Sequence, residues 1–269
     1  MLLPSDEAAG DQTMTNDQVL RVIPLGGLGE VGKNMTVFEY GGETIVIDAG
    51  IAFPRDEHLG VDLILPDFGY LCDRNVLAVI LTHAHEDHVG ALPYLLREVK
   101  VRTVVATRLT LGLVKSKLDE HGLLHASELR EAGPDSGPVE LGPFRAELVR
   151  MSHSVPDAVG VCLETPAGRV FHTGDWKLDH TPVDGLRTDV GKLAELGNRG
   201  VDLLLGDSTN AERPGFTRSE RVVGEAFRQI IPARTGRVLV CSFASNIHRM
   251  QQAIDVAVEV GRSVSVIGR

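Results

Sequence analysis

The feature that most constrains this chain is a cluster of three histidines and an aspartate that directly follows an apolar segment. The run reads Thr82-His83-Ala84-His85-Glu86-Asp87-His88. Side chains alternate along extended backbone, so His83 and His85 project to the same side. Asp87 and His88 lie where a helix is expected to start, and they can turn back toward the same pocket. Imidazole nitrogens and carboxylate oxygens suit zinc, so a strand–loop–helix metal site is predicted.

Composition limits the class of protein. A chain of 269 residues with 43% hydrophobic residues can bury one large or two modest domain cores. No stretch approaches the ~20 apolar residues of a membrane span, and the first residues lack the features of a secretory signal. Cys72, Cys162 and Cys241 are odd in number and scattered, which favours a reducing, cytoplasmic location. The net charge of -10 argues against nonspecific coating of nucleic acid, but it leaves a nuclease open.

The order of patterns along the chain predicts a mixed α/β fold, with strands first in hairpins and then alternating with helices. Residues 1–18 are interpreted as a polar, disordered leader, within which Met14 could be the true start. The expected strands are Leu20–Leu25, Met35–Tyr40, Thr44–Asp48, Val76–Thr82, Arg102–Ala106, alternating segments within Phe144–Phe171, Val201–Leu205, Arg237–Ser242 and Ser263–Ile267. The expected helices are Val89–Glu98, Ser219–Ile231 and Asn246–Val260. The last strand has no covering helix, which predicts truncation or completion of the core in trans.

Further metal ligands are expected at other strand ends, because one loop cannot close two metal shells. His153 follows one alternating strand, and Asp175 ends another, where a carboxylate can bridge two cations. Asp48 ends the apolar strand Ile45-Val46-Ile47 and suits the role of accepting a ring N–H from a ligand histidine. His172 is interpreted as a core histidine and Glu86 as a residue that faces outward.

One competing motif is a glycine pattern that resembles a dinucleotide-binding loop. Gly27-Leu28-Gly29-Glu30-Val31-Gly32 follows a strand, and Asp48 lies at roughly the required distance. That loop requires a helix next, whereas the following residues are expected to form two strands joined by Gly41-Gly42. We therefore expect these glycines to permit close approach of backbone rather than to bind a dinucleotide.

Several passages together resemble known families. The ligand positions, in this order, resemble the metallo-β-lactamase superfamily. More specific passages resemble the ribonuclease J family of β-CASP ribonucleases. They are residues 24–35 (PLGGLGEVGKNM), 59–62 (LGVD), 173–185 (TGDWKLDHTPVDG) and 206–217 (GDSTNAERPGFT), and the segment 242–249 (SFASNIHR) resembles the early β-CASP region.

The resemblance implies an αββα metallo-β-lactamase sandwich with the start of an inserted β-CASP domain. Residues 19–208 would be the first domain and 209–269 the incomplete beginning of the second. Asp207 would match the first β-CASP motif and would be a catalytic residue, together with Asp48 and Asp175. His83, His85 and His153 would hold one Zn²⁺, Asp87 and His88 would begin a second site, and Asp175 would bridge. The later β-CASP histidine motifs have no counterpart here.

The implied activity is zinc-dependent hydrolysis of RNA by hydroxide generated at the metal, as a 5′-3′ exonuclease with endonuclease activity in rRNA processing and mRNA decay. The substrate would be 5′-monophosphorylated single strands, and the complete enzyme would be a homodimer or homotetramer. Candidate RNA contacts are Lys33, Phe53, Arg55, Arg213, Phe243 and Arg249. Two alternatives stay open: another hydrolase on this scaffold that acts on a small molecule, and a fragment that binds metal or RNA without catalysis.

Overall fold

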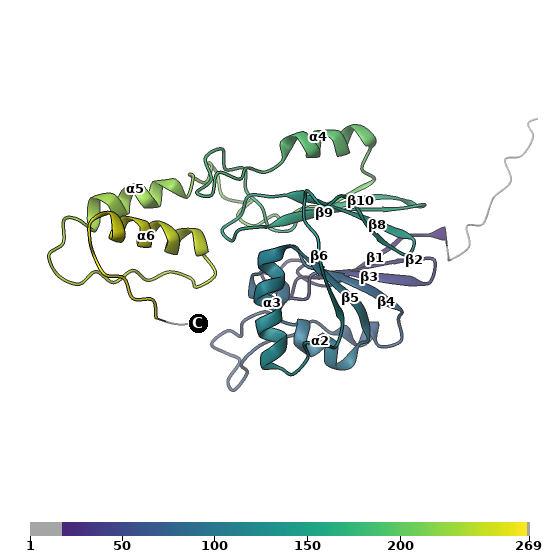
Figure 1. Cartoon of the computed structure of the whole chain (residues 1–269). Coiled ribbons are helices and arrows are strands. Elements are labelled where there is room, and N and C mark those ends of the chain that lie inside the picture. Colours follow the sequence, from purple (N-terminus) through teal and green to yellow (C-terminus); the bar gives the residue numbers. More distant parts are fainter. Residues whose placement is uncertain (1–17, 268–269) are drawn as a thin grey trace, which may run out of the picture.

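Two β-sheets packed face to face, with helices on both outer sides, form the main body of the protein (Figure 1). The computed structural model describes residues 18–267; the expected leader and the alternative start at Met14 therefore lie outside the described residues, apart from Gln18. This αββα arrangement confirms the predicted fold class. No helix between residues 18 and 267 has both the length and the apolar character needed to cross a bilayer.

The first sheet has six strands in sequential order. They are β1 (Arg21–Gly26), β2 (Met35–Tyr40), β3 (Glu43–Ile47), β4 (Val76–Ile80), β5 (Val101–Ala106) and β6 (Glu128–Glu131). The first three pair antiparallel, and β3 to β6 pair parallel. Gly41 and Gly42 both have positive φ, 61° and 77°, which is the backbone that a two-residue hairpin turn requires. The glycine pattern before Met35 therefore leads into a β-hairpin rather than a helix.

The second sheet has five strands in the order β11-β10-β9-β8-β7. They are β7 (Val139–Leu141), β8 (Phe144–Arg150), β9 (Val159–Thr165), β10 (Gly168–His172) and β11 (Leu203–Leu205). Only β10 and β11 pair parallel. Alternate residues of both sheets fill the interface between them, including Phe38, Ile80 and Leu163, all fully buried. Burial of this shared apolar surface holds the two sheets together.

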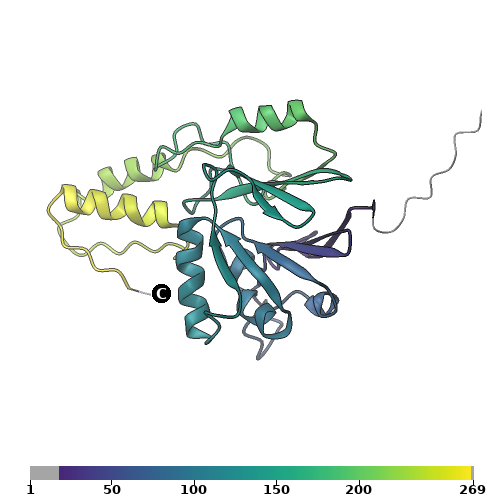
Figure 2. The ribbon, with the colours of Figure 1, turned by 45° about the vertical axis from the view of Figure 1, so that its right-hand side comes forward.

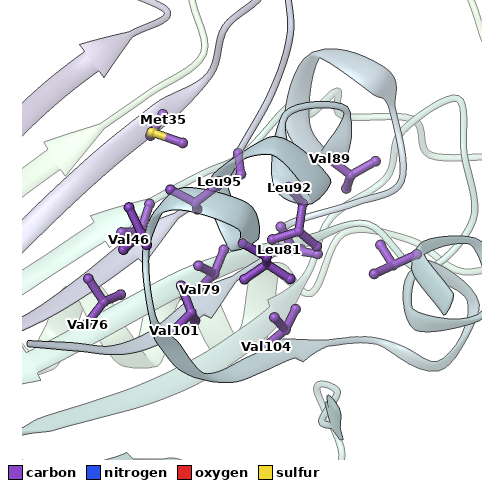
Figure 3. Close-up of a cluster of buried hydrophobic side chains, with 14 of the residues drawn as sticks. Met35, Val46, Val76, Val79, Leu81, Val89, Leu92, Leu95, Val101 and Val104 are labelled. Carbon is purple, nitrogen blue, oxygen red and sulfur yellow. The ribbon is translucent and has the colours of Figure 1, made fainter. Parts of the chain in front are cut away.

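The outer face of the first sheet is covered by α1 (Glu86–Val89), α2 (Leu92–Glu98) and α3 (Arg108–Glu120). Residues Phe68–Leu71 form a short 3₁₀ turn. Figure 3 shows Val79 and Val104 of the sheet beneath Leu92 and Leu95 of α2. The helix α3 was not predicted from the sequence, although its buried positions follow helical spacing. The outer face of the second sheet is covered by α4 (Val190–Arg199), which packs through Leu196.

The single helix expected over Val89–Glu98 is two short helices instead. Ala91 donates its N–H to Ala49 O, and Asp87 O accepts the N–H of Asn34. The backbone groups that would continue one helix are thus used in contacts with neighbouring loops. Pro93, in the first turn of α2, has no N–H to contribute.

Two further helices, α5 (Arg221–Ile230) and α6 (Ile247–Glu259), pack on each other beside one end of the sandwich (Figure 2). The predictions of strands at Arg237–Ser242 and Ser263–Ile267 are wrong for this structure, because both segments have no regular secondary structure and pair with no strand. A strand requires a neighbour to accept its backbone hydrogen bonds, and within residues 18–267 no strand lies alongside either segment.

Candidate metal centre

The predicted ligand residues converge at one end of the sandwich. Strands β3, β4 and β10 end there, and they are followed by Asp48, His83 and Asp175 respectively. His153 lies between β8 and β9 and reaches the same place. Since β3 and β4 are parallel neighbours, their carboxyl ends share an edge, and the facing sheet brings in the other two residues.

The first donor group consists of His83, His85, His153 and Asp175, whose ligand atoms all lie within 4.8 Å of one another. His85 Nδ1 is 3.1 Å from His83 Nε2 and 3.1 Å from His153 Nε2. Asp175 Oδ2 lies 3.7 Å from His153 Nε2. Three ring nitrogens and one carboxylate oxygen therefore face a common point.

The second donor group consists of Asp87, His88 and Asp175. His88 Nε2 is 3.2 Å from Asp175 Oδ1 and 3.7 Å from Asp87 Oδ2. Asp175 turns one oxygen toward each group. Its two oxygens therefore lie one in each group, and the bridging role predicted from the sequence stays a prediction.

The hydrogen bonds behind the histidines determine which ring nitrogens are bare. Thr82 Oγ1 donates to Asp48 Oδ2 at 2.9 Å, because a carboxylate oxygen only accepts. The hydroxyl has no second proton, so it accepts from His83 Nδ1 at 3.0 Å, and His83 Nε2 carries the free lone pair. His88 Nδ1 likewise donates to Asp48 Oδ2 at 2.7 Å. Asp48 thus turns the Nε2 atoms of both histidines toward the donor groups.

In His85 the nitrogen that faces the donor group is Nδ1 rather than Nε2. Its Nε2 faces Ser154 Oγ at 3.4 Å, and the backbone carbonyl of Ser245 favours a proton on the same ring, although burial lowers the pKa of His85 as a whole. Nδ1 is then the bare atom, and it is the one that faces His83 and His153. Ser245 precedes α6, so the C-terminal segment of the chain directly contacts this cluster.

The protonation of these groups suits a metal site. Burial and the neighbouring histidines hold the pKa of His83 well below its usual value, and burial lowers the pKa of His153 to about 4. Burial opposes ionisation of Asp175, but a hydrogen bond and charge interactions with His88 lower its pKa to about 2. Burial would also lower the pKa of His88, yet Asp48 and Asp175 raise it well above the usual value. A cation in the second group would take the place of the His88 Nε2 proton.

The spacing of the donors also fits zinc. With bonds of about 2.05 Å, two ligands of a tetrahedral zinc ion lie about 3.3 Å apart. The nitrogen–nitrogen separations of 3.1 Å in the first group and the nitrogen–oxygen separation of 3.2 Å in the second are close to this value. Neutral imidazoles and an ionised carboxylate are the ligand forms that the ion requires. We conclude that the residues present fit a divalent cation in each group.

Close approach of backbone permits this geometry. A Cβ on Gly50 would lie 1.5 Å from Asp87 O, so the strand end after β3 contacts the ligand loop directly. Gly174 has φ +57°, and a Cβ there would lie 3.0 Å from Thr82 Cβ. Glycine at these two positions lets the ligand loop and the Asp175 loop meet.

The remaining sequence predictions have mixed outcomes. Glu86 is exposed and pairs with Lys117, as expected of an outward-facing residue. His172 Nδ1 accepts the Gly174 N–H and belongs to neither donor group, consistent with its interpretation as a core residue. Asp207 accepts the Thr209 N–H in a local turn and, among the described residues, bonds to no donor-group side chain. Its catalytic role stays a prediction.

The candidate RNA contacts differ in availability. Phe53 and Phe243 are 67% and 81% exposed, and Arg55 is exposed. Lys33 pairs with Glu30 at 3.1 Å. Arg249 is engaged by both carboxylate oxygens of Glu220, so a phosphate contact would require that pair to open.

Two contributors to the centre were missed from the sequence. The Thr82 hydroxyl is hydrogen-bonded to both Asp48 and His83. The side-chain amide of Asn34 lies against Asp87 and His88. Thr82 borders the histidine run, so its position was a usable signal. Asn34 stands 53 residues before Asp87 in the chain, and only the resemblance of its motif marked it.

Comparison with known families agrees with this geometry. The family model described as "Metallo-beta-lactamase superfamily" matches residues 28–191, more than half of the chain. The chain belongs to the metallo-β-lactamase superfamily. A second model, "Ribonuclease J, beta-CASP domain", matches residues 235–269 of this superfamily member. The proposed boundary at residues 208/209 lies between the two matches and stays a prediction.

The resemblance to ribonuclease J is confirmed by curated relatives. Ribonuclease J of Helicobacter pylori is 45% identical over 93% of this chain, and that of Thermus thermophilus is 46% identical over 97%. Ribonuclease J of Mycobacterium tuberculosis is 47% identical over 93%. The chain spans only 36–46% of the length of these three proteins.

One solved structure shares the fold. A protein of unknown function from Enterococcus faecalis superposes with a TM-score of 0.65 at 17% identity, covering 88% of this chain and 63% of that one.

Proposed function

We propose that this chain carries the metal centre of a zinc-dependent ribonuclease that hydrolyses phosphodiester bonds of RNA. The observation that carries the proposal is the pair of donor groups joined by Asp175 in a chain about 45% identical to proteins named ribonuclease J. The finer assignment is a 5′-3′ exonuclease with endonuclease activity, acting in RNA maturation and decay in the cytoplasm.

In this proposal the side chains divide the work at the centre. His83, His85 and His153 would hold one cation, Asp87 and His88 would hold the second, and Asp175 would serve both. The cations would lower the pKa of bound water and neutralise charge on phosphate oxygens.

Behind the ligands, Asp48 keeps the ring protons on the far nitrogens, so that the lone pairs stay directed inward. Burial of His83 and His88 limits their motion and keeps the ligand geometry fixed.

RNA would reach the centre past exposed aromatic rings. Phe53 and Phe243 are available for stacking of bases, and Arg55 for contact with a phosphate. The proposed substrate is a single strand with a 5′-monophosphate, and the proposed assembly of the complete enzyme is a homodimer or homotetramer.

A metal-site double variant tests the function. The test uses the protein encoded by the open reading frame that contains this chain. We expect His83→Ala combined with His85→Ala to lower the amount of zinc bound per chain. The same change should abolish hydrolysis of 5′-labelled, monophosphorylated RNA. His121→Ala is the matched control, because His121 belongs to neither donor group. Hydrolysis that survives the double change in zinc-depleted buffer would refute the proposal. Release of labelled mononucleotides distinguishes exonuclease from endonuclease action.

A further inference from the structure

Asn34 lies in the loop between β1 and β2, and its side chain enters the second donor group. Its Nδ2 is 3.1 Å from His88 Nε2, 3.5 Å from Asp87 Oδ2 and 3.0 Å from Asp87 O. The residue is well fixed, because its N–H donates to Asp87 O and its carbonyl accepts the N–H of Gly50. A side chain on so rigid a support acts at a defined point.

In its present orientation the Asn34 amide makes few hydrogen bonds. Nδ2 donates to Asp87 O, but that carbonyl already accepts the backbone N–H of Asn34 at 3.1 Å. Oδ1 accepts no hydrogen bond from any residue in the described part of the chain and lies against Gly27, where a Cβ would approach it to 2.6 Å. Asp87 O therefore has a second donor whichever way the amide is turned, and Oδ1 has no partner among the described residues.

A cation in the second group changes which orientation is favourable. His88 Nε2 and Asp87 Oδ2 both face that position, so the Asn34 N–H would point at a positive charge. Rotation of the amide by 180° exchanges Oδ1 and Nδ2 with little change in shape. Oδ1 would then occupy the place about 3.1 Å from His88 Nε2 and 3.5 Å from Asp87 Oδ2, separations typical of ligands that share one ion. The same rotation would place Oδ1 about 3.0 Å from Asp87 O, which keeps the backbone N–H of Asn34, so the attraction of the cation must outweigh the repulsion between these two oxygens.

We propose that Asn34 supplies an amide oxygen as a further ligand of the second cation, beside Asp87, His88 and Asp175. The inference rests on the proposed metal centre, and it adds a neutral donor to a group that otherwise offers two carboxylates and one imidazole. An amide oxygen fills a coordination position without adding charge next to Asp175. The contribution is specific to the second cation, because none of the first group's histidines contacts Asn34.

Metal titration of this chain tests the assignment without reference to activity. Competition with a chromophoric chelator gives the affinity of each zinc site for wild type and for Asn34→Ala. We expect the second site to weaken at least about tenfold while the first site is unchanged, which also shows that the variant is folded. Asn75→Ala is the matched control, because Asn75 donates only to Glu43 at the surface.

A second measurement separates a ligand from a residue that merely orients Asp87. In chain labelled with ¹³C and ¹⁵N, the Asn34 side-chain amide signals should shift when the second equivalent of zinc binds, and not with the first. Amide signals that stay in place, a second site of unchanged affinity in Asn34→Ala, or a chain that binds only one zinc would each overturn the assignment. Loss of RNA hydrolysis does not enter this test, so the proposed ribonuclease activity can fail while the ligand assignment stands.

Discussion

Asp48→Asn is expected to disable both donor groups while leaving the fold intact. The carboxylate accepts Thr82 N–H through Oδ1 at 2.8 Å, and its Oδ2 accepts from Thr82 Oγ1 and from His88 Nδ1. Asparagine has the same shape and tolerates the φ of +63° found at this position. Its Oδ1 can keep the Thr82 N–H, so its NH₂ group must replace Oδ2. The new NH₂ group would then face two other donors, the Thr82 hydroxyl and His88 Nδ1–H.

The conflict propagates to the ligand atoms. His88 must accept at Nδ1, so its remaining proton stays on Nε2, the atom directed at Asp175, where a cation would otherwise replace it. Thr82 Oγ1 can no longer donate to residue 48, so it accepts there and donates to His83 Nδ1 instead. The His83 proton then also moves to Nε2. Substitution of one oxygen by nitrogen therefore blocks one lone pair in each donor group.

Partners of this kind typically change metal affinity by about 10–100-fold, or about 1.4–2.7 kcal/mol for each cation. Zinc titration of Asp48→Asn by chelator competition measures the loss at both sites. Asp67→Asn is the matched control, because Asp67 is exposed and caps a short 3₁₀ turn far from any ligand histidine. Affinities within twofold of wild type at both sites would refute the tautomer argument.

Three further outcomes follow from the structure. Gly50→Ala should lower the free energy of unfolding by at least about 2 kcal/mol in urea titrations, whereas Gly112→Ala, with open space around it in α3, should raise it by about 0.4–1 kcal/mol. Burial raises the pKa of the Cys162 thiol to about 11, so a thiol reagent at pH 8 should label the two exposed cysteines of the native chain and reach Cys162 only after unfolding. Burial opposes ionisation of Glu147, but Lys192 and Arg199 hold its pKa below the usual 4.5. Its stabilisation is therefore complete above about pH 4.5 and is lost as the pH falls further, so Glu147→Gln should cost less at pH 4 than at pH 7 in chemical denaturation.

The centre could be predicted from the sequence as far as its members are linked by local rules. His83 and His85 follow a period of two along extended backbone, and Asp87 and His88 follow at the start of a helix. Asp175 was predicted by a second rule, that further ligands lie at the ends of other strands because one loop cannot close two metal shells. Neither rule covers Asn34, because its approach depends on the path of a loop that is fixed by Gly50 and Asp87.

The break between α1 and α2 shows a similar limit. The apolar spacing from Val89 to Glu98 is that of one helix, and the sequence supports that interpretation. Ala91 nevertheless gives its N–H to Ala49, a residue 42 positions earlier. A hydrogen bond to a distant loop overrides the local pattern, and the pattern contains no sign of it.

The helix α6 was predicted correctly, whereas the segments on either side of it were wrongly predicted to be strands. The helix was predicted to within one residue at each end, because its signals are its own: Asn246 accepts the Arg249 N–H at its start, and its apolar positions repeat with helical spacing. The flanking segments have equally clear strand composition, yet Leu239 is 82% exposed and Ile267 is 94% exposed. A helix satisfies its backbone hydrogen bonds internally, whereas a strand satisfies them only through a neighbour. Strand-like sequence therefore specifies a capacity to pair, and whether residues 237–242 and 263–267 form a sheet depends on the strand that comes to lie beside them.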